Sequence, residues 1–146
     1  MTPAADFAFA KLVPELLVTD LAASLRFWCD LCGFVVAFER PEDGFAYLDR
    51  GGAQVMLEQI AAPGRRWITG AVERPFGRGV NFQIDVDDVA VVLAGLSAVG
   101  WPRFLEPEEK WYRAGTRDVG VRQFLVQDPD GYLVRFSQPL GSRAVC

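Results

Sequence analysis

The sequence contains no histidine among its 146 residues. This absence excludes Ser-His-Asp and Cys-His catalytic triads, histidine general bases and every metal site that needs an imidazole ligand. Cysteine is also scarce, because Cys29, Cys32 and Cys146 form neither an even disulfide framework nor a four-ligand zinc set. Cys29 and Cys32 have redox-motif spacing but lie near the C-terminal end of an expected helix, where no helix dipole stabilises a thiolate. We therefore interpret both as packing thiols.

Basic charge and long apolar runs are missing as well. Lys plus Arg number 15 against 19 Asp plus Glu, a net charge of -4 that disfavours nucleic acid and favours a cationic small molecule. The longest apolar run, residues 89–96, is far shorter than the ~20 residues that span a bilayer, so we expect no membrane partner. The first residues lack the features of a signal peptide, and we expect a cytoplasmic protein.

The chain instead contains an internal repeat of two similar segments. Their landmarks correspond in order: Val18-Thr19-Asp20-Leu21 with Val86-Asp87-Asp88-Val89, Gly33 with Gly100, Asp49 with Asp128, and Gln59 with Gln138. Such agreement indicates duplicated supersecondary units. We assign residues 12–60 to a first module, 61–78 to a linker rich in Gly, Pro and Arg, and 79–139 to a second module, together forming one domain over residues 1–146.

Each module has the pattern of a βαβββ unit. Apolar-rich strands are predicted over residues 12–18 and 80–86. Asp20 caps the helix that follows the first strand, Asp87 or Asp88 caps its counterpart, and both helices end at a glycine. Three strands follow in each module, the last two joined by tight turns at residues 49–52 and 128–131. The predicted fold is α+β, with two tandem βαβββ modules whose curled sheets surround a cleft.

The segments VTDLAASLRFWCDLCGF and RQFLVQDPDGYLVRF resemble the vicinal oxygen chelate superfamily, the glyoxalase/bleomycin resistance/dioxygenase group. The resemblance implies four metal-ligand positions, two per module, which are occupied here by Val13, Met56, Asn81 and Arg135. Valine and methionine are not ligands for hard divalent cations, and arginine adds a fixed positive charge. We therefore expect no metal and no other cofactor, and the chain is most similar to the metal-free bleomycin resistance branch.

Members of that branch bind flat cationic drugs in acid-rimmed clefts shared by two subunits, and they stack the drug on a tryptophan. The corresponding stretch here, Val119-Gly120-Val121, has no aromatic residue. Trp111 and Tyr112, which we place in a polar loop beside Glu106, Glu108 and Glu109, are the nearest substitutes. Either one could instead pack on the sheet. Trp67 in the linker is a further ligand candidate or a dimer contact, whereas Trp28 is expected in the core.

Two charged residues complete the candidate site. Arg135 interrupts an apolar strand and either contacts an anionic ligand group or pairs with Glu58 or another cleft carboxylate. Glu58 lies two residues beyond Met56, on the same face of its strand. The ligand-binding candidates are thus Trp111, Tyr112, Glu58, Arg135, Asn81 and Trp67.

The leading hypothesis is a metal-independent homodimer that sequesters a cationic, aromatic antibiotic or similar small molecule. One alternative is a metal-free enzyme of the superfamily that uses Glu58 or Tyr112 as an acid or base. Another is a structural or regulatory dimer whose cleft binds no ligand.

Overall fold

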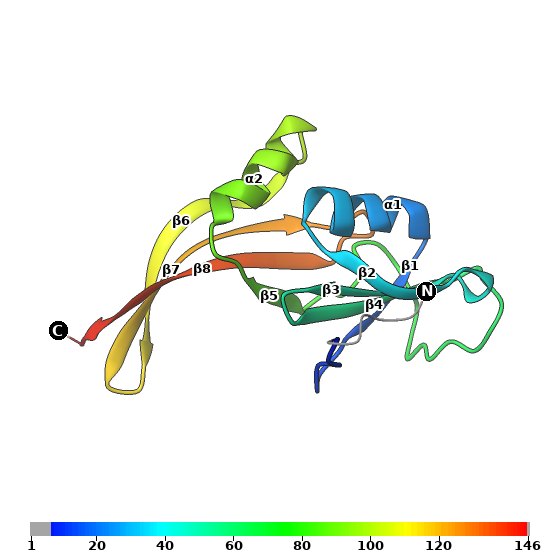
Figure 1. The fold of residues 1–146 in the computed structure, drawn as a ribbon, viewed down its shortest axis with the longest axis horizontal. Helices are drawn as coiled ribbons and strands as arrows, with labels where there is room; N and C mark the ends of the chain where they lie inside the picture. Colours follow the sequence, from blue (N-terminus) through cyan, green and yellow to red (C-terminus); the bar gives the residue numbers. More distant parts are fainter. Residues whose placement is uncertain (1–6, 146) are drawn as a thin grey trace. The chain divides into compact units, whose positions relative to one another are not determined.

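The computed structural model describes residues 7–145 and consists of two compact units, the first ending at Phe76 and the second beginning at Gly77. The elements of the first unit are β1 (Glu15–Val18), α1 (Leu21–Leu25), a π-helical turn (Arg26–Leu31), β2 (Val35–Arg40), a short 3-10 helix (Pro41–Asp43), β3 (Phe45–Arg50) and β4 (Ala53–Gln59). Those of the second unit are β5 (Asn81–Asp85), α2 (Val89–Ala98), β6 (Arg103–Ala114), β7 (Arg117–Gln127) and β8 (Leu133–Ala144) (Figure 1).

Both sheets have the same topology. The strand order is β1-β4-β3-β2 in the first unit and β5-β8-β7-β6 in the second. In each, the first and last strands pair in parallel and the other neighbours are antiparallel. The register repeats too, because Glu15 lies opposite Met56 and Gln83 lies opposite Arg135. The predicted α+β fold of two tandem βαβββ units is confirmed.

Each helix begins at a capping aspartate, as the sequence predicts. The Ala23 N–H donates to Oδ1 of Asp20 at 3.2 Å, and the Ala90 N–H donates to Oδ1 of Asp88 at 2.9 Å. The structure thereby selects Asp88 over Asp87 as the second cap.

The repeated glutamine has a related role at the same helix ends. Oε1 of Gln59 accepts from the Leu21 N–H at 2.9 Å, and Oε1 of Gln138 accepts from the Val89 N–H at 3.1 Å. The last strand of each unit therefore binds the first turn of its helix and satisfies an N–H that has no partner within the helix.

The two helices end as expected, but the first contains an irregularity that the sequence pattern does not reveal. Gly33 and Gly100 adopt φ angles of 82° and 68°, which favour glycine. After Leu25 the first helix widens into a π-helical turn, in which the Cys32 N–H bonds to the Phe27 carbonyl at 3.0 Å. The wider turn changes the buried stripe, so that Phe27 is buried together with Trp28 and Cys32.

The helix-facing sides of the two sheets form separate cores. In the first unit, the core consists of Leu16, Val18, Ala46, Leu48, Val55 and Leu57 from the strands and Phe27, Trp28 and Phe34 from the helix and the turn after it. In the second unit, α2 contacts β7 and β8, and the core consists of Ile84, Val89, Val92, Leu96, Phe124, Val126, Val134 and Phe136. Within residues 7–145, neither helix is long and apolar enough to cross a membrane.

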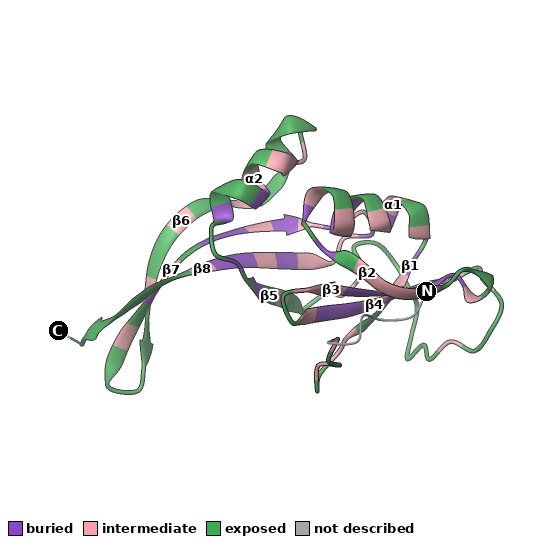
Figure 2. Ribbon diagram, viewed as in Figure 1, coloured by how far each residue is buried: buried purple, intermediate pink, exposed green. Residues whose placement is uncertain are grey.

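The prediction that Trp111 and Tyr112 lie in a loop is wrong, because both belong to β6. Residues 103–127 form a long β-hairpin that turns at residues 115–116 and continues beyond α2, and its far end is mostly exposed (Figures 1 and 2). The charged residues and Pro107 suggested a loop, but β6 is an edge strand, where both are tolerated. The register of β6 shifts between Leu105 and Glu108, and Pro107 lies within that irregularity.

The expected strands at residues 12–18 and 80–86 are shorter than predicted. The first begins at Glu15 and the second covers Asn81–Asp85. Pro14 has no N–H for the sheet, although its carbonyl accepts from the Met56 N–H at 2.9 Å.

Trp28 is 0% exposed and packs edge-on against Phe27 and Phe34. Trp28→Ala should lower the free energy of unfolding by about 3–5 kcal/mol, because it removes a large core side chain and leaves a cavity. Trp67→Ala is the control, since Trp67 is 72% exposed and its loss should change stability by no more than about 0.5 kcal/mol. Urea unfolding of both variants measures the difference, and similar losses would contradict the assignment of Trp28 to the core.

Candidate functional site

Each sheet has a second side that points away from its helix, which we call the far face. Residues opposite each other on paired strands share a face, so the register identifies its members. The far face of the second sheet includes Asn81, Gln83, Asp85, Leu105, Glu108, Tyr112, Gln123, Leu125, Leu133, Arg135 and Ser137. Three of the candidates from sequence, Asn81, Tyr112 and Arg135, therefore lie on one face of one sheet.

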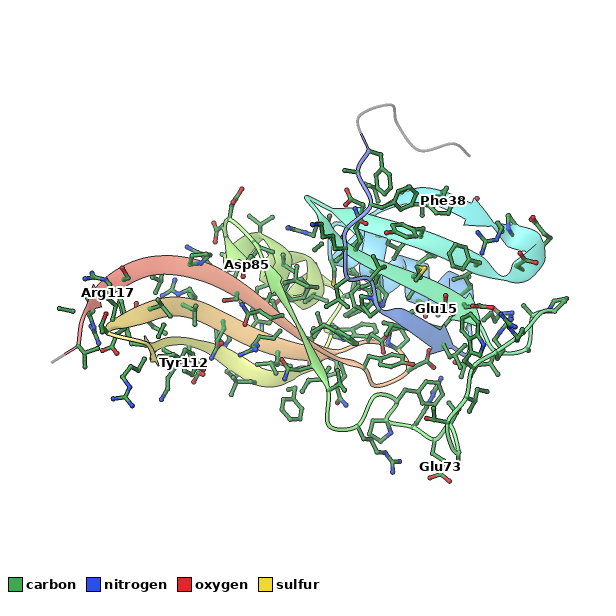
Figure 3. The ribbon with its side chains drawn as sticks, turned by 90° about the horizontal axis from the view of Figure 1, so that it is seen from below. Glu15, Phe38, Glu73, Asp85, Tyr112 and Arg117 are labelled. Atoms are coloured by element: carbon green, nitrogen blue, oxygen red, sulfur yellow. The ribbon has the colours of Figure 1, made fainter. Side chains whose placement is uncertain are left out.

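Gln123 connects the polar side chains on this face. Its Nε2 donates to the Tyr112 hydroxyl at 2.7 Å and to Oε1 of Glu108 at 3.0 Å. Gln123 is buried, whereas Tyr112, labelled on β6 in Figure 3, is 41% exposed. The amide holds a phenol and a carboxylate in place while leaving part of the tyrosine ring accessible.

Arg135 lies in the middle of β8 between Gln83 and Leu125 on the adjacent strands. Its sequence neighbours Val134 and Phe136 are fully buried on the helix side, so Arg135 points to the far face. Nε of Arg135 is buried and has no hydrogen-bond partner within residues 7–145.

Trp111 does not accompany Tyr112. Consecutive strand residues point to opposite faces, so Trp111 lies on the α2 side of the hairpin, opposite Gly120. Its indole covers that glycine so closely that a Cβ at Gly120 would lie 2.7 Å from two ring atoms. The Arg143 guanidinium lies over the ring at 4.0 Å from its centroid. Trp111 and Tyr112 therefore cannot stack on the same ring of one ligand, and Trp111 packs on the sheet.

The far face of the first sheet has a different character. It includes Glu15 and Leu17 of β1, Phe38 and Arg40 of β2, Phe45 and Tyr47 of β3, and Gln54, Met56 and Glu58 of β4. Glu58 forms an ion pair with Arg66 from the segment after β4, at 2.5 Å. The two side chains are only 14% and 8% exposed, and Arg66 also donates to the carbonyls of Gln59 and Ala62. Arg66 thus neutralises Glu58 and fastens its own loop to the strand.

Glu15, labelled in Figure 3, lies beside this ion pair. Burial, a side-chain hydrogen bond with Glu58 and repulsion from the Glu58 charge together raise the pKa of Glu15 to about 7, although Arg66 and Arg40 act in the opposite direction. A carboxyl group with a pKa near 7, as Glu15 has, can donate or accept a proton at neutral pH.

The other end of the same face is covered by the segment that precedes β1. Gln54 is buried, accepts from the Tyr47 hydroxyl and the Ala10 N–H, and donates to the Ala8 carbonyl and to Asp49. Phe7 and Phe9 meet Tyr47 edge-on at centroid distances of 5.9 and 5.6 Å. At the opposite end of the face, Glu15 is exposed while Glu58 is largely covered.

Trp67 lies in the segment between β4 and β5, is exposed, and has the Arg65 guanidinium 4.7 Å from its ring centroid.

Burial, with a smaller contribution from Asp30, raises the pKa of the Cys29 thiol to about 11, and Cys32 is buried. A thiol that stays protonated at neutral pH agrees with a packing role and not with a redox pair.

The metal-ligand positions implied by the resemblance do not fit a metal. Met56 and Arg135 occupy equivalent register positions in β4 and β8, and Asn81 is the only oxygen donor of the four residues. Within residues 7–145, no three His, Cys, Asp or Glu side chains come together as a metal site.

Sequence reasoning missed Glu15, Arg66 and Gln123. Glu15 follows Val13 by two residues, just as Glu58 follows Met56, so the matched spacing could have identified the carboxyl pair. Arg66 carried no comparable signal, because one arginine in an Arg-rich linker is not distinguished by its sequence.

Residues 9–136 match the family model of the Glyoxalase/Bleomycin resistance protein/Dioxygenase superfamily. The chain belongs to this superfamily. Bleomycin resistance proteins of Geobacillus stearothermophilus and Staphylococcus aureus are each 26% identical to it over 142 residues, which cover 89% of this chain and 97% of theirs.

Solved structures show the same fold. TioX from Micromonospora sp. ML1 superimposes with a TM-score of 0.69 at 24% identity, over 92% of this chain and 100% of that chain. Lactoylglutathione lyase from Agrobacterium tumefaciens gives a TM-score of 0.58 at 22% identity, over 88% and 92% of the two chains. At these identities the similarity establishes the fold alone.

Packing of Trp111 on Gly120 can be tested by a double-mutant cycle. Gly120→Ala should cost about 1–3 kcal/mol in unfolding free energy, because its Cβ collides with a rigid indole. In a Trp111→Ala background the same change should cost no more than about 0.5 kcal/mol. An equal cost of Gly120→Ala in both backgrounds, measured by urea unfolding, would show that the indole does not cover the glycine.

The raised pKa of Glu15 predicts a pH-dependent difference between wild type and Glu15→Gln. The folded state keeps a proton that the unfolded chain loses above pH 4.5, so the contribution of Glu15 to stability falls as the pH rises toward 7. Glutamine stays neutral, and Glu15→Gln should therefore gain stability relative to wild type over this pH range. Unfolding at several pH values tests this, with the exposed Glu42→Gln as the charge-matched control. Parallel curves for wild type and Glu15→Gln would rule out a shared proton.

Proposed function

We propose that the protein is a metal-independent binding protein that sequesters a cationic, aromatic antibiotic or a similar small molecule without altering it. The observation that carries the proposal is the identity of the residues at the superfamily's metal positions: Val13, Met56, Asn81 and Arg135 cannot supply a ligand set. The bleomycin resistance proteins are relatives over almost their whole length and indicate the class of ligand.

The far face of the second sheet supplies groups suited to such a ligand. Tyr112 offers an accessible aromatic ring, and Gln123 holds its hydroxyl. Glu108 places a carboxylate beside it, which suits a cationic group. We therefore assign the stacking role to Tyr112 alone, because Trp111 packs on Gly120.

A homodimer belongs to the same proposal, with the ligand in a cleft to which both subunits contribute. Two exposed strand edges support it. β6 ends the second sheet, and β8 beyond Ser137 has no strand on its β5 side within the described residues. Free strand edges of this kind favour association with another chain.

The alternative function is a metal-free enzyme, and one observation favours it. The carboxyl group of Glu15, which is hydrogen-bonded to Glu58, has its pKa raised to about 7, and this value suits an acid–base catalyst at neutral pH. The sequence suggests Glu58 or Tyr112 for this role. Because Glu58 is paired with Arg66, we prefer Glu15 to Glu58 as the acid or base.

Calorimetric titration with bleomycin in the presence of EDTA tests the proposal. We expect saturable binding, with the ligand recovered intact by mass spectrometry and stability raised by about 2.7 kcal/mol at a hundredfold excess over Kd. Tyr112→Ala should weaken binding by roughly 1–3 kcal/mol, while Phe104→Ala, an exposed aromatic on the same strand, should not. A chemically changed ligand would support the enzyme instead, and binding that EDTA abolishes would contradict metal independence.

A further inference from the structure

Arg135 is a charged side chain in the middle of a sheet, at a place where the first unit has an apolar one. It lies at the centre of the far face of the second sheet, with Gln83 and Leu125 beside it on the neighbouring strands. The equivalent residue in the first unit, at the same register position, is Met56. Since the repeated sheet accepts an apolar residue at this place, a guanidinium there is not required for folding.

One atom of the guanidinium lacks the hydrogen bond that a buried donor normally has. Nε of Arg135 is buried without a hydrogen bond within the part of the chain that the structure describes. The carboxylates nearest on its face are engaged elsewhere: Glu108 accepts from Gln123, and Asp85 accepts from Gln83 at 3.3 Å. Several other arginines are paired, among them Arg40 with Asp43, Arg66 with Glu58 and Arg103 with Glu106. Burying a donor without a partner is unfavourable, so we expect this Nε to lower the stability of the ligand-free protein.

We propose that Arg135 is the anchor of a subsite for a carboxylate attached to an apolar group. The planar fork of a guanidinium matches a carboxylate through two parallel hydrogen bonds. Leu125, opposite Arg135, and Leu133, two residues before it on β8, lie on the same face and can contact the apolar part of the ligand. This inference rests on the proposed function and adds to it that the sequestered molecule carries an anionic group as well as its cationic, aromatic part.

Benzoate is a suitable probe, with benzamide as its neutral counterpart and inorganic phosphate as an oxyanion without a ring. The Nε–Hε signal of Arg135, assigned in the NMR spectrum by its loss in Arg135→Met, should shift saturably with benzoate. Arg135→Met should weaken benzoate binding roughly tenfold to a hundredfold, the range for one charge-assisted contact. Arg122→Met, an exposed arginine on the adjacent strand β7, is the matched control and should bind benzoate as wild type does.

A second readout needs no ligand. Because Nε of Arg135 is buried without a hydrogen bond among residues 7–145, Arg135→Met should raise the thermal midpoint of the free protein. The chain already contains methionine at the equivalent position of the first unit. A lowered midpoint would show that Arg135 supports the fold and would overturn the proposal.

The other outcomes are equally decisive. Binding of benzoate that survives Arg135→Met, or no saturable shift at all, overturns the subsite. Phosphate or benzamide binding as tightly as benzoate overturns the assignment to an apolar carboxylate. If bleomycin fails to bind while benzoate binds through Arg135, the subsite stands and the identity of the sequestered molecule is wrong; bleomycin binding without benzoate binding refutes the subsite alone.

Discussion

The bond between the last strand and the first turn of the helix determines the geometry of each unit. Gln59 and Gln138 accept the first free N–H of their helices, while β4 and β8 also pair in parallel with the strands that lead into those helices. The helix start, the first strand and the last strand are therefore fixed relative to one another. Their fixed positions set the register between the first and last strands. Because side chains alternate along a strand, the register also determines which residues lie on the far face. This register places Glu15 and Glu58 on the far face of the first sheet, and Gln83 and Arg135 on the far face of the second.

The elements set by local chemistry were predictable from the sequence. Asp20 and Asp88 cap helices, and Gly33 and Gly100 end them, because these effects depend on neighbouring residues only. The π-helical turn at Arg26–Leu31 was not predictable, because the periodicity of apolar residues does not distinguish it from a regular helix. The β6–β7 hairpin was missed for another reason. Charges and a proline are typical of loops, but an edge strand tolerates them, and edge position is a property of the assembled sheet.

The candidate site was predictable only in part, since it depends on which side chains meet. Asn81, Tyr112 and Arg135 share a face, but Trp111 lies on the opposite one. The prediction that Trp111 and Tyr112 lie in a loop could not reveal this separation, because it follows from the alternation of side chains along a strand. Glu58 was identified as a far-face carboxylate, yet its partner Arg66 comes from a linker with several arginines. Long-range pairing of this kind is decided by the path of the chain and not by local pattern.

The two repeats agree on the helix side of their sheets and differ on the far side. Both cores are built from aliphatic and aromatic residues at matching positions, whereas Met56 and Glu58 in one unit correspond to Arg135 and Ser137 in the other. At or beside the positions where the resemblance places metal ligands, the first unit has a Glu15 carboxyl whose pKa is raised to about 7 beside Glu58. The second unit has an arginine whose Nε is buried without a hydrogen bond among residues 7–145. Both groups, Glu15 beside Glu58 and Arg135, can interact through hydrogen bonds and charge, and neither needs a coordinated metal ion. The two units therefore share the apolar framework of the helix side, while the chemistry of their far faces differs.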